Sequence, residues 1–157
     1  MIEPENLEHK VILSLLNYTK AEGNFLEEFS SQIIKKKENI FFSLEDLYSL
    51  QFPISKDLFE NWIQINNKPI SFLTLKESFN IKICSSGEFD SLFHKDENRW
   101  SVFYSISRPG FSENGDYALI QITAHCPAGP PNYGSLYLLE KNDSIWNVNY
   151  SYGIYNQ

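Results

Sequence analysis

His125 and Cys126 are adjacent and are the residue types with the greatest chemical reactivity in this sequence. A cysteine nucleophile needs a general base within hydrogen-bond reach. The pair lies at the end of an expected strand, where neighbouring side chains point to opposite faces, so the two residues cannot form a dyad with each other. We interpret His125 as an ordinary strand-end histidine, with a place in a binding site as the alternative.

Other patterns of catalysis and metal binding are missing from the sequence. His9 and His94 have no spacing typical of metal ligands. The chain has no phosphate-binding G-x-x-x-x-G-K or G-x-G-x-x-G, no G-x-S-x-G and no H-E-x-x-H. The positions of Glu3, Glu5, Glu8 and Glu27-Glu28 are explained by the preference of acidic residues for the first turn of a helix. Asp96-Glu97 is explained by a solvated loop. The sequence therefore favours a non-enzyme with no catalytic residues, no metal and no cofactor.

The two cysteines, Cys84 and Cys126, are far apart in the sequence. A secreted disulfide scaffold would contain more cysteines, and a zinc knuckle needs four ligands at short spacings. Two reduced, half-buried thiols are the favoured interpretation. A disulfide between them stays open as the alternative for an exported chain.

Composition and charge restrict the class of protein. A chain of 157 residues that is 42% hydrophobic and 15% aromatic has ample core material for one folded domain. Its net charge of −7 argues against nucleic acid and anionic membranes as partners, and is compatible with a basic protein partner. Residues 1–6 lack a signal-peptide pattern, and no apolar run is long enough to span a bilayer. We expect a cytoplasmic protein, with export after removal of a leader as the alternative.

Residues 1–66 predict a helical layer. The apolar spacing and the capping residues predict helices over roughly 4–22, 24–37, 43–50 and 56–65. The first two are expected to form an antiparallel hairpin. Ser55 is expected to cap the last one, whose buried side is formed by Leu58, Phe59, Trp62 and Ile63.

Residues 67–157 predict a sheet. Strands are expected over 80–84, 100–108, 117–126, 133–140 and 145–152, from alternating apolar residues and intervening turn residues. The last four form an antiparallel meander. Trp146, Val148 and Tyr150 are expected to share one face of the final strand. The prediction is a single α+β domain, residues 1–157, with the helices packed on one face of the meander.

Aromatic residues are the best candidates for binding. Most of them are accounted for by core packing, but interfaces also favour Tyr, Trp and Arg. Arg108 is a candidate for the polar anchor of a binding site, with a structural role as the alternative. The residues predicted to bind a partner or line a pocket are Trp62, Trp100, Tyr104, Arg108, His125 and Tyr133.

A series of short motifs carries a resemblance to a known family. In order, they are W-S-V-F-Y at 100–104, S-R-P-G-F at 107–111, Y-A-L-I at 117–120, Y-L-L-E-K at 137–141 and W-N-V at 146–148. Upstream, D-L-F-E-N-W-I at 57–63 and N-x-K-P at 66–69 complete the series. It resembles a family of small, functionally uncharacterised bacterial proteins over roughly Leu58 to Val148. Pro109 departs from the family's aliphatic residue, and the segment between Tyr104 and Ser107 is shorter.

The resemblance implies a shared fold and no established activity. The segment L-L-E-K-N-D-S-I-W-N-V also resembles the end of the cone-shaped fold of nuclear-transport-factor-like domains, in which helices and a curved sheet enclose a pocket. Two functions follow as hypotheses. The favoured one is a non-enzymatic protein-interaction domain, for example an immunity-type inhibitor of a toxin. The alternative is a pocket protein that binds or hydrolyses a small molecule. The oligomeric state stays open.

Overall fold

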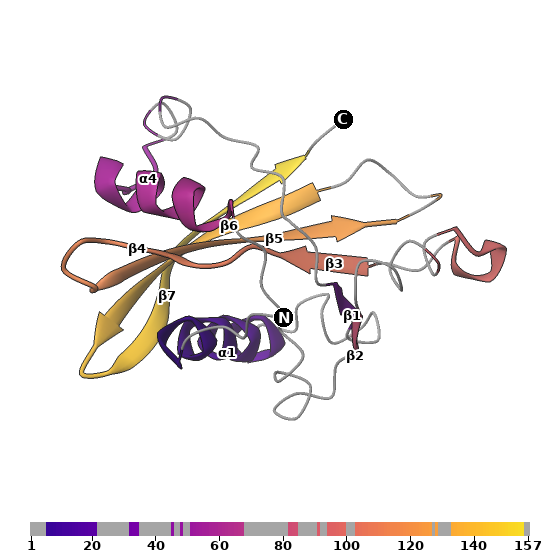
Figure 1. Ribbon diagram of the computed structural model, residues 1–157, viewed down its shortest axis with the longest axis horizontal. Helices are drawn as coiled ribbons and strands as arrows, with labels where there is room; N and C mark the ends of the chain where they lie inside the picture. Colours follow the sequence, from indigo (N-terminus) through magenta and orange to yellow (C-terminus); the bar gives the residue numbers. More distant parts are fainter. Residues whose placement is uncertain are drawn as a thin grey trace.

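The computed structural model describes most of the C-terminal half of the chain and selected parts of the N-terminal half (Figure 1). The described residues are 6–21, 32–34, 45, 48, 51–67, 82–84, 91, 94–99, 103–126, 128 and 133–155. In chain order the elements are α1 (Asn6–Ala21), β1 (Gln32–Ile34), α4 (Lys56–Ile65), β2 (Lys82–Cys84), the 3₁₀ turn η2 (Asp96–Asn98), β3 (Phe103–Ile106), β4 (Gly110–Phe111), β5 (Tyr117–His125), β6 (Tyr133–Asn142) and β7 (Ile145–Tyr155).

The described strands form one sheet in the order β2-β1-β3-β5-β6-β7. The short strand β4 also pairs with β5, closer to the N-terminal end of β5 than β3 does. Strands β3, β5, β6 and β7 pair antiparallel with one another in this order, so the predicted four-strand meander and the α+β class are confirmed. Strands β1 and β2 extend the sheet with parallel pairing, which the sequence did not predict. None of the helices in the described parts of the chain is long and apolar enough to cross a membrane.

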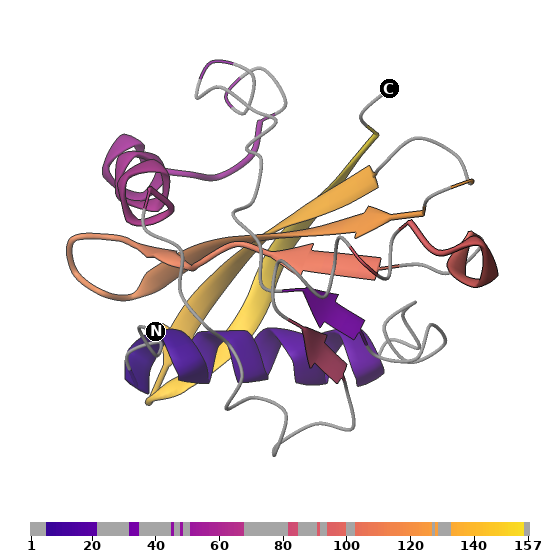
Figure 2. The same ribbon diagram turned by 45° about the vertical axis from the view of Figure 1, so that its right-hand side comes forward.

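Helices α1 and α4 pack on opposite faces of the meander (Figures 1 and 2). On β5 and β6, Ile120 and its partner Tyr137 pack against α1, whereas Leu119 and its partner Leu138 pack against α4. The prediction that the helices cover a single face is therefore wrong. A strand alternates its side chains, and both faces of this meander are apolar, so each face needs its own cover.

The helix expected over 24–37 is contradicted at Gln32–Ile34, which form strand β1. Ile33 pairs with Ile83 of β2 on one side and with Tyr104 of β3 on the other. Parallel partners distant in the sequence override the local helix propensity of this segment. The rest of the predicted helix lies outside the described residues.

A β-bulge in β7 (Ile145–Tyr155) moves the side chains that follow it to the opposite face of the sheet. Val148 pairs with Leu139 and Tyr150 pairs with Leu138, so Asn149 is an extra residue on β7. Trp146 and Val148 therefore pack on the α1 face, while Tyr150 lies on the α4 face with its ring 4.9 Å from that of Phe52. The prediction that Trp146, Val148 and Tyr150 share a face is wrong for Tyr150.

Helix α4 begins and ends where the sequence predicts. The Ser55 side chain accepts a hydrogen bond from the Leu58 amide, as an N-cap does, and Leu58, Phe59 and Trp62 are buried. The cap fixes the start of the helix. The apolar residues then fix which side of it faces the sheet, and this orientation determines what α4 presents to the segment between β3 and β4.

Candidate functional site

Ser107 lies in the interruption between β3 and β4, and its hydroxyl is the centre of a buried polar network. The oxygen accepts hydrogen bonds from the Trp62 indole (3.1 Å) and the Gln121 amide (2.9 Å), and the hydroxyl donates to the Arg108 carbonyl (3.1 Å). These bonds use the single donor and both acceptor positions of a hydroxyl. Ser107 therefore satisfies polar groups that would otherwise be buried without partners. Trp62, a predicted binding residue, has no exposed surface and anchors α4 to the sheet.

Arg108 is the second predicted binding residue in this region, and its guanidinium is already bound. Nε lies 2.8 Å from Oε1 of Glu8 and Nη2 lies 3.0 Å from Oε2, a bidentate ion pair. Nη1 also donates to the Ile65 carbonyl at the end of α4. The side chains of Glu8 and Arg108 are only 3% and 14% exposed. Arg108 thus connects α1 to α4 across the edge of the meander.

Two asparagines of α4 hold the backbone of the same segment. Asn66 accepts from the Arg108 amide (2.8 Å) and donates to the Arg108 carbonyl (3.0 Å), and Asn61 accepts from the Phe111 amide (2.7 Å). Gly110 lies so close to α4 that an added Cβ would be 2.6 Å from the Trp62 backbone nitrogen. Only glycine fits this approach.

These contacts give the residues of the S-R-P-G-F segment (107–111) their roles in the fold. In this segment, Ser107 accepts the hydrogen bond of the Trp62 indole, and Arg108 forms the ion pair with Glu8. Gly110 leaves room for the close approach of α4. The Phe111 ring packs 6.0 Å from that of Trp146. The upstream motifs supply Asn61, Trp62 and Asn66. The described contacts of these residues are architectural, since they join α4, α1 and the sheet.

Of the remaining predicted binding residues, three are described, by their backbone alone. Trp100 lies outside the described residues. For Tyr104, His125 and Tyr133 the backbone is described, and the register places Tyr104 and Tyr133 on either side of Ala124, with His125 opposite Phe103. Cys126 is a free thiol whose Sγ lies 3.6 Å from the Arg99 carbonyl. No group of His, Cys, Asp and Glu within the described ranges could hold a metal ion.

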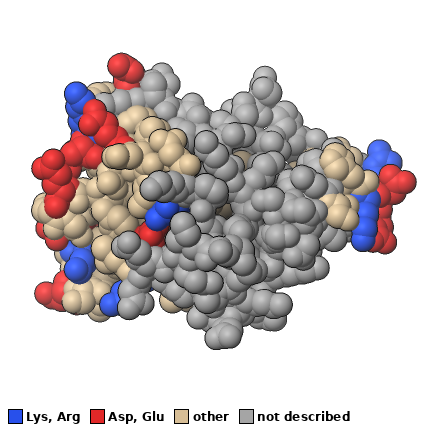
Figure 3. Space-filling model, in the orientation of Figure 1, with Lys and Arg blue, Asp and Glu red and all other residues tan. Residues whose placement is uncertain are grey.

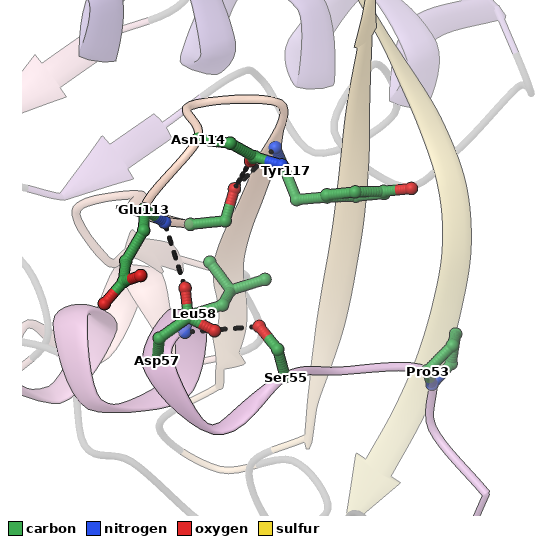
Figure 4. A pocket seen from close by; sticks show the side chains of 8 residues that line it. Pro53, Ser55, Asp57, Leu58, Glu113, Asn114 and Tyr117 are labelled. Atoms are coloured by element: carbon green, nitrogen blue, oxygen red, sulfur yellow. Dashed lines mark hydrogen bonds between the residues drawn. The ribbon is translucent and has the colours of Figure 1, made fainter.

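Three open hollows lie in a row along α4, on the side of the turn that joins β4 to β5, and neighbouring hollows share lining residues, so we treat them as one groove. One end is a pocket of about 390 Å³ that includes Pro53, Asp57, Glu113 and Tyr117 (Figure 4). The hollow continues past Asp57, Glu60 and Glu113, and reaches Arg108 at the far end. We call this hollow the α4 groove, and it opens on the surface. The alternative hypothesis requires a pocket enclosed between the helices and a curved sheet, which this groove is not.

The charged lining of the α4 groove is mostly acidic. Asp57, Glu60 and Glu113 contribute carboxylates, and Glu60 forms an exposed ion pair with Lys56 at 3.8 Å. The cation among the lining residues, Arg108, is paired with Glu8. In Figure 3, acidic side chains with some basic ones among them lie at the left end, where Figure 1 places α4 and the β4–β5 turn. The groove therefore presents negative charge to a partner.

Asp57 is held in place by both walls of the groove. Oδ2 accepts a hydrogen bond from the Glu113 amide at 2.9 Å (Figure 4). A hydrogen bond with the Ser55 side chain, followed by that with the Glu113 amide, lowers the pKa of Asp57 below its ordinary value of 3.8. The carboxylate is ionised at neutral pH and fixes the distance between α4 and the turn.

Sequence reasoning did not find Glu8 or the acidic groove. Glu8 was attributed to the favourable position of an acid in the first turn of a helix, and such a residue needs no buried partner. Asp57 and Glu113 are 56 residues apart, and their types and spacing form no motif. The sequence held only an indirect signal for the groove. The segments N-W-I (61–63) and S-R-P-G-F (107–111) contact each other and so bring α4 next to the β4–β5 turn.

Comparison of the chain with protein-family models, curated protein sequences and solved structures gave no match. The geometry and charge of the α4 groove are thus the basis for a proposal about function.

Proposed function

We propose that this chain is a non-enzymatic interaction domain that binds a basic protein in the α4 groove. The observation that carries the proposal is the acidic lining of the groove. Asp57, Glu60 and Glu113 contribute carboxylates, of which Glu60 forms an exposed ion pair with Lys56, while Arg108 is neutralised by Glu8. The chain's net charge of −7 adds long-range attraction for a basic partner. An immunity-type inhibitor that covers a basic face of a toxic protein is the concrete form of this function.

The groove offers a partner both charge and shape. The Tyr117 ring and Pro53 form one end of it, opposite the carboxylates of Asp57 and Glu113 (Figure 4). A lysine or arginine side chain has an apolar stem and a cationic head, so it can contact the ring and a carboxylate at the same time. We therefore expect one or two basic side chains of the partner to occupy this end.

The proposal is tested by affinity capture from a lysate of the source cell, with mass spectrometry of the retained proteins. Three baits are compared: the wild-type chain, the double variant Glu60→Gln/Glu113→Gln, and the control Asp96→Asn/Glu97→Gln. Both doubles remove two negative charges at exposed positions, but the control changes η2, at the other end of the molecule in Figure 3. Asp57 is kept because it has a structural hydrogen bond.

A basic protein retained by the wild-type and control baits, and lost from the groove variant, is the expected result. Retention by all three baits would place binding elsewhere on the chain. Retention of the same proteins by the wild-type bait and by an unrelated acidic protein would show general attraction of charge, and would contradict a specific groove.

A further inference from the structure

Strand β7 is the outermost strand on its side of the sheet. Its eleven residues, Ile145–Tyr155, pair with β6 on one edge, and no backbone hydrogen bond from the described residues reaches the other edge. A strand of this length extends about 37 Å. It presents a row of backbone donors and acceptors that another strand can pair with.

This edge lacks most of the features that usually prevent pairing between molecules. The segment I-W-N-V-N-Y-S-Y-G-I-Y has no charged residue and no proline. Charged residues are 21% of the chain, so an average stretch of this length holds about two. Ile145 and Tyr150 are 63% and 38% exposed. The bulge at Asn149 is the single irregularity along the strand's pairing with β6.

The direction of the backbone groups follows from the turn before β7. Asp143 and Ser144 both have positive φ, as in the two-residue hairpin turn in which the flanking residues, Asn142 and Ile145, form a hydrogen-bonded pair. Bonded and non-bonded pairs then alternate along β6. After the register shift at Leu138, this alternation directs the amides of Ser151 and Gly153 away from β6. These amides are available to an incoming strand.

We propose that the β7 edge pairs antiparallel with β7 of a second copy of this chain, which joins two sheets across a two-fold axis. A two-fold contact places the same surface on both partners, so it requires an edge that is complementary to itself. Two copies with a net charge of −7 repel each other, and this uncharged edge is where they approach without opposing acids.

The antiparallel arrangement also separates the acidic ends. In Figure 1 the β6–β7 turn, α4 and the β4–β5 turn lie at one end of the sheet, and β7 ends toward the other. Pairing about a two-fold axis places the acidic end of one copy beside the opposite end of its partner. The two α4 grooves then lie apart by roughly the length of the strand, well beyond a Debye length of about 8 Å. The dimer thus leaves both grooves accessible.

The test is the molecular mass of the chain in solution, measured by sedimentation and light scattering from low to high micromolar concentration. The wild-type chain is expected to approach the mass of two chains. Ser151→Pro removes an outward amide and leaves the pairing with β6 intact, so it is expected to stay monomeric. Ser151→Ala is the matched control and is expected to dimerise. Should Ser151→Pro fail to fold, Ser151→Lys replaces it, since it adds a like charge to the pairing edge of each copy.

Two results would overturn the inference. One is a dimer that persists in folded Ser151→Pro or Ser151→Lys, because the contact would then lie elsewhere. The other is a wild-type chain that stays monomeric at the highest concentration. Hydrogen exchange would then separate two causes: slow exchange at Ser151 and Gly153 would show that a segment of the same chain covers the edge, and fast exchange would show that the edge is free. Neither result bears on binding in the α4 groove, which the Glu60 and Glu113 variant tests separately.

Discussion

The guanidinium of Arg108 forms a bidentate ion pair with the carboxylate of Glu8, one hundred residues earlier in the chain, with N–O distances of 2.8 and 3.0 Å. Glu8 belongs to α1 on one face of the meander, and Arg108 also bonds the Ile65 carbonyl of α4, which covers the other face. One side chain thus contributes to the positions of both helices. It also removes the cationic charge of Arg108 from the α4 groove.

Arg108→Ala should destabilise the fold, because it leaves the carboxylate of Glu8 buried without its partner. We expect a loss of about 3–5 kcal/mol in the free energy of unfolding, measured by urea denaturation. Arg108→Lys keeps the charge but not the two parallel bonds, and should lose less. Stability of Arg108→Ala within about 0.5 kcal/mol of wild type would contradict a structural role and restore Arg108 as a free anchor for a partner.

Gly110→Ala should destabilise the contact between α4 and β4. The new methyl group would lie 2.6 Å from the Trp62 backbone nitrogen, so the helix must shift. Overpacking of this kind costs about 1–3 kcal/mol, which thermal or urea denaturation can measure. Gly153→Ala is the matched control, since its methyl group would meet only Ser135 Oγ at 3.9 Å, and it should be nearly neutral. Equal effects of the two substitutions would show that α4 is not held as closely as described.

The parts of the fold that could be predicted from the sequence are those determined by local signals. The start and approximate end of helix α4 were predicted correctly, because its N-cap at Ser55 and the apolar spacing of Leu58, Phe59 and Trp62 are local signals. The meander was predicted because alternation within each strand is also local. Strand β1 was not, since three residues show no periodicity and become a strand only through β2 and β3.

The placement of the helices depends on packing between distant segments. The amphipathic patterns of α1 and α4 do not indicate which face of the sheet each helix covers. Likewise, one extra residue, Asn149, places Tyr150 on the face opposite to the predicted one. Of the candidate site, Trp62 and Arg108 were chosen from residue type. Their partners Ser107 and Glu8 were not, because a serine and a first-turn glutamate are ordinary at those positions.

Ser55→Ala should raise the pKa of Asp57, because the hydrogen bond with Ser55 is the largest cause of its lowering. In the wild-type chain the lowered pKa contributes stability that is present above pH 3.8 and is lost as the pH falls below this value through the folded-state pKa. The variant should lose part of this acid-range contribution, and about 1 kcal/mol at all pH values from the missing N-cap. Carbon-detected NMR titration of the Asp57 carboxyl measures the pKa. An unchanged pKa in Ser55→Ala would contradict the assigned cause.

The central claim is that carboxylates of the α4 groove bind a basic protein, and the most direct measurement is the dissociation constant of the captured partner by calorimetry. Glu60→Gln/Glu113→Gln should raise Kd roughly tenfold, about 0.7 kcal/mol for each exposed charge, with a weaker dependence on salt than wild type. Asp96→Asn/Glu97→Gln should leave Kd within about twofold. Equal Kd values for wild type and the groove variant, or an equal loss in both double variants, would contradict the assignment of the groove as the binding site.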